Sequence, residues 1–349
     1  MNPHRYVKDS RGTLSTLKRI DEKGRLYYLD YLDNYHGLPF SLFMNAFHLT
    51  GRACSAFIRR NEKGEVITGR NYDMPHFNKK KEVTGVHVIV RCHGRYESLN
   101  CADAWWLRKL AKGGYDQGRL DDGITDISAL MLLPYFCMDG INEKGLTVSI
   151  LALNLKEGEK AVYQRRKGRK KIMIAELLRQ LLDNCQNIEE AIGLTNTFDL
   201  INNAGFDYHL FLTDASGRSA VFEWRYNTFT VTYNDICTNF YVAYDDYSDY
   251  YKNGKLMEVF AADFDTKIKY RYGFGYSYDN FRILATELDG KERISEEEAH
   301  ELLKKTTRVY EDEGDSYTQY SALYNADELR ASYWVAQDHE HRYDFYIER

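Results

Sequence analysis

Cys54, Arg70 and Asp73 are the residues whose types and spacing could do chemistry in this sequence. A cysteine attacks carbonyl carbons as the thiolate, and a guanidinium and a carboxylate beside the thiol form an environment that can support this ionised form. The alternative is a buried cysteine next to an incidental surface ion pair. Spacing alone does not choose between these two interpretations, because one cysteine with charged neighbours is a weak signal.

A predicted β-hairpin brings these three residues together. Residues 55–60 and 65–72 are typical of strands, and the turn at 61–64 ends in glycine, which tolerates a left-handed backbone. Residues whose numbers sum to about 125 then pair, so Cys54 faces Asn71, give or take one residue for a glycine bulge. The arginine and the aspartate would lie at the same end of the hairpin as the thiol.

A cysteine nucleophile needs a base, and no histidine can be paired with Cys54 from the sequence. The ten histidines are scattered, and His209 lies in a predicted strand, where a core position is expected. A free α-amine has a pKa of about 7.7–8.0, near the thiol's value of about 8.5, so an N-terminal cysteine can supply its own base. This mechanism would require cleavage of the bond between Ala53 and Cys54. The sequence contains no G-x-S-x-G elbow, P-loop or H-E-x-x-H site.

Composition narrows the class of protein. The 349 residues carry a formal net charge of -5, with 44% hydrophobic and 28% charged residues, which is typical of a globular protein. Because there is no apolar run of about 18 residues and no signal-peptide core, the sequence predicts a cytoplasmic protein that does not bind membranes. The near-neutral charge balance argues against nucleic-acid binding. The six cysteines form no C-x-x-C pair, so no disulfide scaffold, metal site or cofactor is expected.

The remaining pattern predicts a layered α+β domain, without internal repeats or a Pro/Gly/Ser-rich linker. The basic run at 165–171 is expected to be a solvated loop, with an acidic ligand as the alternative. Further strands are predicted at 135–140, 146–151, 208–213, 219–225, 228–233, 236–243, 317–324 and 343–347. Helices are predicted at 172–182, 282–288 and 295–306. A further helix is predicted through 189–192, with Asn187 as its N-cap.

Six segments along the chain carry motifs that can be compared with known families: C-S-A-F at 54–57, G-R-N-Y-D at 69–73, D-G-I-N-E-K-G-L at 139–146, A-L-N at 152–154, D-A-S-G-R-S-A-V-F-E at 214–223 and C-T-N at 237–239. Together they resemble the choloylglycine hydrolase family, which includes penicillin V acylases and bile salt hydrolases. The resemblance also extends to isopenicillin N acyltransferase and acid ceramidase. It implies a four-layer αββα sandwich of the N-terminal nucleophile hydrolase type over residues 54–349.

The resemblance also implies an activity. The protein would be a cysteine hydrolase that cleaves the linear amide C–N bond of a small N-acyl compound through a thioester. Residues 1–53 would be a pro-segment removed by autocleavage, and their tyrosine-rich surface could cover the substrate pocket or stay bound afterwards. Two alternatives stay open: an acyltransferase of the isopenicillin N acyltransferase type, and an uncleaved binding protein without activity. The sequence leaves the oligomeric state open, with a homo-oligomer as one alternative, since tetramers are common among these relatives.

The same resemblance gives roles to the hairpin residues. Cys54 would be the nucleophile, and its freed α-amine the general base. Asp73 would hold that amine by a charge-assisted hydrogen bond. Arg70 would lie near the sulfur, favour the thiolate and orient the acyl group.

Further site residues follow from the later matches. The Asn239 side chain and the backbone N–H of Asn154 would donate hydrogen bonds to the tetrahedral oxyanion. The family's late catalytic arginine falls on Arg282 in one register and on Asn280 in another, and we favour Arg282. For each asparagine the alternative is a turn residue or a residue at the end of a strand.

Overall fold

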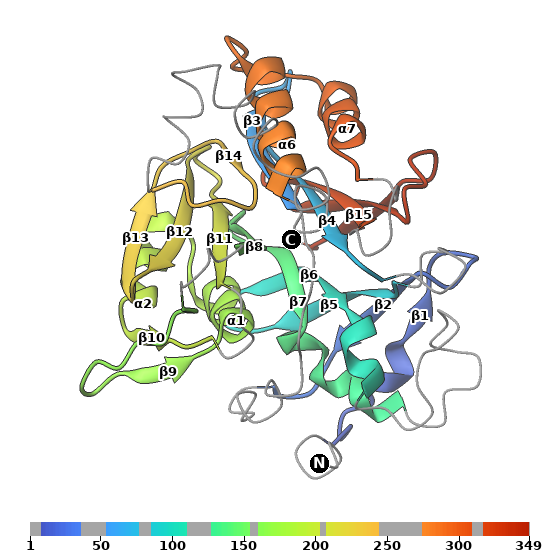
Figure 1. The fold of residues 1–349 in the computed structure, drawn as a ribbon. Helices are drawn as coiled ribbons and strands as arrows, with labels where there is room; N and C mark the ends of the chain where they lie inside the picture. Colours follow the sequence, from blue (N-terminus) through green and yellow to red (C-terminus); the bar gives the residue numbers. More distant parts are fainter. Residues whose placement is uncertain are drawn as a thin grey trace.

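Two large β-sheets form the centre of the protein (Figure 1). The computed structural model describes residues 8–35, 54–76, 85–109, 127–153, 160–202, 207–243, 274–308 and 317–348. Within these residues, the larger sheet contains β1 (Lys18–Arg19), β2 (Leu26–Tyr31), β5 (His87–His93), β6 (Glu97–Asp103), β7 (Cys137–Asn142), β8 (Thr147–Leu153), β11 (Asp207–Thr213), β12 (Ser219–Arg225) and β13 (Thr228–Thr232), in that order. The smaller sheet has the order β14 (Ile236–Cys237), β3 (Cys54–Arg60), β4 (Val66–Met74), β15 (Tyr317–Asn325), β16 (Arg330–Val335) and β17 (Tyr343–Tyr346).

Helices cover the outer face of each sheet. The pair α6 (Phe274–Leu288) and α7 (Glu296–Lys305) packs on β3 and β4, whereas α1 (Ile174–Asn184) packs on β7 and β8. The arrangement helix, sheet, sheet, helix confirms the predicted α+β fold with four αββα layers. Short elements complete the described chain: α2 (Ile188–Thr195), β9 (Lys170–Ile172), β10 (Phe198–Leu200) and the 3-10 helices at Thr13–Thr16, Ala104–Lys109 and Ile127–Tyr135.

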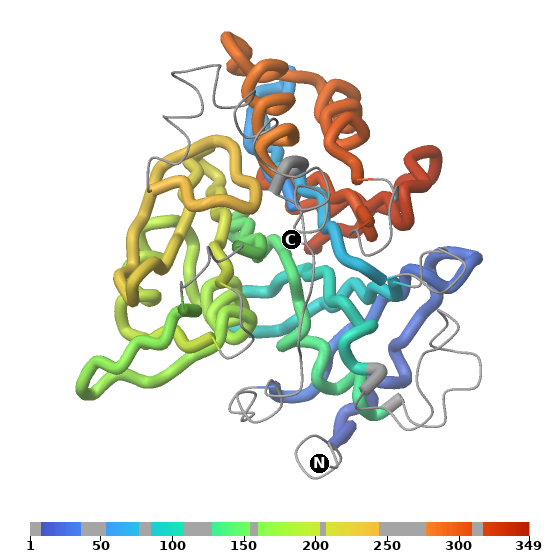
Figure 2. Tube along the Cα trace, in the orientation of Figure 1, coloured from blue at the N-terminus to red at the C-terminus, as the bar shows by residue number. Residues whose placement is uncertain are grey.

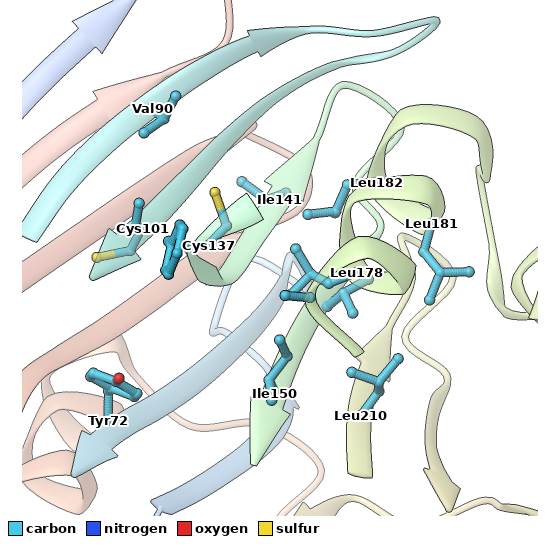
Figure 3. Close-up of a cluster of buried hydrophobic side chains, with 14 of the residues drawn as sticks. Tyr72, Val90, Cys101, Cys137, Ile141, Ile150, Leu178, Leu181, Leu182 and Leu210 are labelled. Atoms are coloured by element: carbon cyan, nitrogen blue, oxygen red, sulfur yellow. The ribbon is translucent and has the colours of Figure 1, made fainter. Parts of the chain in front are cut away.

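The apolar spacing of α1 explains its packing. Leu178, Leu181 and Leu182 recur at helical spacing and are buried. Figure 3 shows Leu182 beside Ile141 and Leu178 near Ile150, on the two strands beneath the helix. Burying a leucine side chain contributes about 2 kcal/mol, so this stripe fixes α1 on the sheet. No helix among the described residues is both long enough and apolar enough to cross a membrane.

The N-terminal segment contributes to the core. Strand β2 lies inside the larger sheet, where it pairs in parallel with β5 (Figure 2). Tyr31 is buried and donates from its hydroxyl to the carbonyl of Met131 at 2.7 Å. Tyr35 is also buried, and its hydroxyl donates to Asp183 of α1 at 2.9 Å. Strand β2 and Tyr35 are therefore part of the buried core.

The predicted hairpin is present, with a register one residue away from the expected pair. Cys54 pairs with Tyr72 and Ser55 pairs with Asn71, within the allowance made for a bulge. The strand predicted at 236–243 is shorter than expected and ends at Cys237. Beyond it the backbone N–H of Asn239 donates to the Ser277 hydroxyl, and those of Val242 and Ala243 donate to the Glu223 carboxylate, instead of to a neighbouring strand. The helix predicted at 282–288 begins earlier, at Phe274.

Candidate active site

Cys54 is the first residue of β3 and lies between the two sheets. Its thiol shares a face with Tyr72, its cross-strand partner, and with Arg70, the partner of Ala56, since alternate residues of a strand point to the same side. Cys54 is only 3% exposed. All six cysteines are buried and free of disulfides. The fold therefore places the predicted nucleophile and the predicted cation next to each other.

Arg70 is completely buried and held at three points. Its guanidinium forms an ion pair with Asp139, and Nη2 donates to the carbonyl of Ile150 at 2.8 Å. The guanidinium carbon also lies 5.5 Å from the ring centre of Tyr72. Burial disfavours the charge, but the Asp139 carboxylate and the Cys54 thiol outweigh it and raise the pKa of Arg70. Arg70 is thus a fixed cation beside the sulfur.

Asp73 lies one residue beyond the partner of Cys54 and is completely buried. Its carboxylate accepts a hydrogen bond from the Thr318 hydroxyl at 2.6 Å. Burial raises the pKa of Asp73 to about 7, although Thr318 and the nearby cations Arg308 and Arg70 oppose the rise. A carboxyl group with this pKa is suited to exchange a proton with an amine near neutral pH.

The raised pKa of Asp73 predicts how stability depends on pH. In the folded state the group holds its proton up to about pH 7, whereas the unfolded group releases it near its ordinary value of 3.8. Stability from this group is therefore present below about pH 4 and is lost as pH rises to about 7, by on the order of 4 kcal/mol. Chemical denaturation of Cys54→Ala and of Cys54→Ala with Asp73→Asn should show a steeper loss in the first protein. Equal slopes would contradict the prediction.

Asn239 contacts the backbone nitrogen of Cys54. Its Oδ1 accepts from that N–H at 2.5 Å, and its Nδ2 donates to the carbonyl of Ala152 at 2.7 Å. The backbone N–H of Asn239 donates to the hydroxyl of Ser277 on α6 at 2.7 Å. Because an amide NH₂ carries two hydrogens, Ala152 uses only one of them. This side chain is thus placed at Cys54, where a hydrogen-bond donor to a carbonyl attacked by the thiol would have to lie.

The structure does not place Asn154 or Arg282, the other two predicted site residues, beside Cys54. Asn154 lies outside the described residues, just after the last residue of β8. Arg282 has an exposed side chain on α6. Asn280, the other register, is buried on that helix and donates to the carbonyl of Thr306 at 3.1 Å. Among the described side chains of α6, Ser277 contacts Asn239, and no pattern in the sequence singled it out.

A buried chain of polar side chains behind Asn239 was not predicted. His209 is a core residue, as expected, but its Nε2 lies 3.5 Å from the Cys237 sulfur and its Nδ1 lies 3.1 Å from Glu223. Glu223 accepts from the backbone N–H groups of Val242 and Ala243, both at 2.8 Å. The carboxylate therefore fixes the segment that carries Asn239. Strand pairing between 209 and 223 is the only sequence signal that could have indicated this contact.

The described residues contain no group of three or more His, Cys, Asp or Glu side chains arranged to hold a metal ion. What they do contain is a thiol next to a buried cation, a carboxyl group that titrates near neutrality, and an amide at the backbone nitrogen of the cysteine. This set of groups suits nucleophilic attack on a carbonyl carbon.

The fold is similar to that of known proteins. Among solved structures, a mutant of the conjugated bile acid hydrolase from Clostridium perfringens is similar with a TM-score of 0.56 at 14% identity, covering 84% of this chain and 92% of that chain. Penicillin V acylase from Agrobacterium tumefaciens is similar with a TM-score of 0.50 at 16% identity, covering 81% and 83%. At these identities the similarity shows the fold. No curated protein matches the chain significantly.

The family itself follows from the sequence model that the chain matches. Residues 54–265 match the linear amide C-N hydrolases, choloylglycine hydrolase family. The match covers more than half of the chain and begins at the cysteine that starts β3. The chain therefore belongs to the choloylglycine hydrolase family of linear amide C–N hydrolases.

Proposed function

We propose that the protein is a cysteine N-terminal nucleophile hydrolase that cleaves the amide bond of a small N-acyl compound through a thioester. The observation that carries the proposal is the position of Cys54, with its thiol beside Arg70 and its backbone nitrogen bonded to the Asn239 side chain. The start of the family match at the same residue supports it. Asn154 and Arg282 stay predictions, as second oxyanion donor and late cation.

In the proposed reaction the α-amine of Cys54 carries the proton of the thiol to the leaving amine. Cleavage of the bond before Cys54 frees its α-amine, which takes the thiol proton while the sulfur attacks the amide carbonyl. The tetrahedral oxyanion accepts a hydrogen bond from the Asn239 amide, and the C–N bond then breaks as the amine side receives the proton. Water hydrolyses the thioester, which releases the acid and restores the thiol. Asp73 holds the ammonium form of the amine during the first step.

The test is intact-mass analysis of purified protein combined with a panel of N-acyl amides. We expect the loss of residues 1–53 from the large fragment, and an acyl-enzyme adduct on the peptide that begins with Cys54. Product ratios should not change when free amines are added, because water is the acyl acceptor. An uncut chain with full turnover would refute the mechanism, and capture of the acyl group by the amine would indicate an acyltransferase instead.

Cleavage should leave residues 1–53 bound to the rest of the protein. Removing β2 would open the larger sheet at β5 and would take Tyr35 away from Asp183, which forms a buried ion pair with Arg179. An unpaired buried charge or hydrogen-bonding group costs several kcal/mol, so separation is strongly disfavoured. Denaturing mass spectrometry should find two chains, and native mass spectrometry one complex. Loss of the small fragment during gel filtration without denaturant would contradict this expectation.

A further inference from the structure

Asp139 joins the two sheets at the back of the candidate site. It comes from β7 of the larger sheet and is completely buried. Its Oδ2 accepts from the Tyr320 hydroxyl and its Oδ1 from the Tyr324 hydroxyl, both at 2.5 Å. The third contact is the ion pair with Arg70. All three donors come from the smaller sheet, so the carboxylate of the larger sheet is hydrogen-bonded entirely by residues of the opposite sheet.

The packing of the two sheets does not by itself require a buried carboxylate with three polar partners at this position. Burying a carboxylate costs several kcal/mol unless its oxygens are paired and hydrogen-bonded, and an apolar side chain of similar size would avoid that cost. The tyrosines are themselves restrained, since the Tyr324 and Tyr333 hydroxyls lie 3.0 Å apart. A fixed carboxylate in turn restricts the guanidinium of Arg70, whose long side chain would otherwise sample several rotamers. The network therefore determines where the cation lies relative to the thiol.

The contact between Asp139 and Arg70 also changes the electrostatic field at the Cys54 sulfur. Arg70 interacts with both Asp139 and the Cys54 thiol, but it touches the carboxylate directly. Opposite charges in contact largely offset each other at a third group farther away. Among the described residues, Arg70 and Tyr72 from β4 and Cys237 from β14 interact electrostatically with the Cys54 thiol. Asp139 interacts with Arg70, and also with the side chains of Tyr320, Tyr324, Tyr333, Cys101 and Cys137.

We propose that Asp139, held by Tyr320 and Tyr324, is a positioning residue that fixes Arg70 beside Cys54 and offsets its charge there. The thiol then keeps its proton until the α-amine accepts it, and Arg70 acts mainly in orienting the acyl group. This inference rests on the proposed function for the role of the amine. The fixed position of Arg70 and the offset of its charge can be tested without any turnover.

The experiment is a pH titration of the ultraviolet thiolate absorbance, taken as the difference between each protein and the same protein carrying Cys54→Ala. In Asp139→Asn the charge of Arg70 is no longer offset, so the Cys54 midpoint should move to lower pH by about one unit, a tenfold change in proton affinity. Asp235→Asn is the matched control. It removes a carboxylate from an ion pair with Arg59 at the surface, 2.9 Å long, and should leave the midpoint unchanged.

A second variant keeps the proposal testable if Asp139→Asn does not fold. Tyr320→Phe with Tyr324→Phe retains both rings and removes two donors from the carboxylate, which makes Asp139 easier to protonate. The Cys54 midpoint should move in the same direction by a smaller amount. An unchanged or higher midpoint in both variants would overturn the inference. Because absorbance is read without substrate, failure of the proposed hydrolysis would show separately, as an inactive protein with the expected shift.

Discussion

Replacing Cys54 by alanine is expected to abolish both self-cleavage and amide hydrolysis. Without the sulfur, the side chain at position 54 has no atom that can attack the preceding peptide bond or the substrate carbonyl. The loss in kcat should be at least about 10⁴-fold, as for other enzymes that lose their nucleophile. Intact mass should show the full 349-residue chain, and product release should fall to the background rate.

Cys185→Ala is the control for this experiment. Cys185 is also buried, at the end of α1, and lies apart from the candidate site. It should be cut and should hydrolyse amides within about threefold of the unmodified protein, since a small truncation away from the site costs about 1 kcal/mol of stability. Cleavage or turnover retained by Cys54→Ala would mean that another group is the nucleophile, and the proposed mechanism would be wrong.

Local signals made much of the fold predictable. The hairpin of β3 and β4 follows from a short turn with glycine at position 64, where the backbone has φ 88°. The cap at Asn187 is present, and its side chain accepts from the N–H of Glu190 at 3.0 Å. The strand β2 could not be placed in the same way. Its partner β5 begins 61 residues after it, at His87 opposite Leu26, and no turn links the two.

In the candidate site, only contacts between residues that lie near each other in the sequence could be predicted. Cys54 and Arg70 meet through one hairpin, so spacing and register indicate the contact. Thr318 reaches Asp73 across 245 residues, and Tyr324 reaches Asp139 across 185. Such contacts depend on how strands pair and on which faces of the sheets meet. A threonine or a tyrosine in a strand is too common to mark a site.

Replacing Asn239 should reduce kcat by about 10²–10³-fold with little change in KM. An oxyanion donor acts on charge that develops only in the transition state, and removing one such donor costs about 3–4 kcal/mol. Asn239→Asp is the sharper variant because it retains an oxygen that can accept from the Cys54 nitrogen, as Oδ1 does now, and lacks the NH₂. Self-cleavage should slow in both Asn239→Ala and Asn239→Asp, since it also passes through a tetrahedral oxyanion.

A control variant, Asn234→Ala, helps to distinguish a catalytic role of Asn239 from a purely structural one. Asn234→Ala changes a nearby asparagine whose Nδ2 donates to the carbonyl of Ile236 at 2.8 Å, outside the site, and should leave kcat within about twofold. If Asn239 served only to anchor β14 to β3, Asn239→Asp would lower the melting temperature while kcat stayed normal in the folded fraction. That result would remove Asn239 from the oxyanion site. A loss of kcat at unchanged stability would instead place its amide at the reacting carbonyl, because only a group that touches the transition state slows the chemical step without loosening the fold.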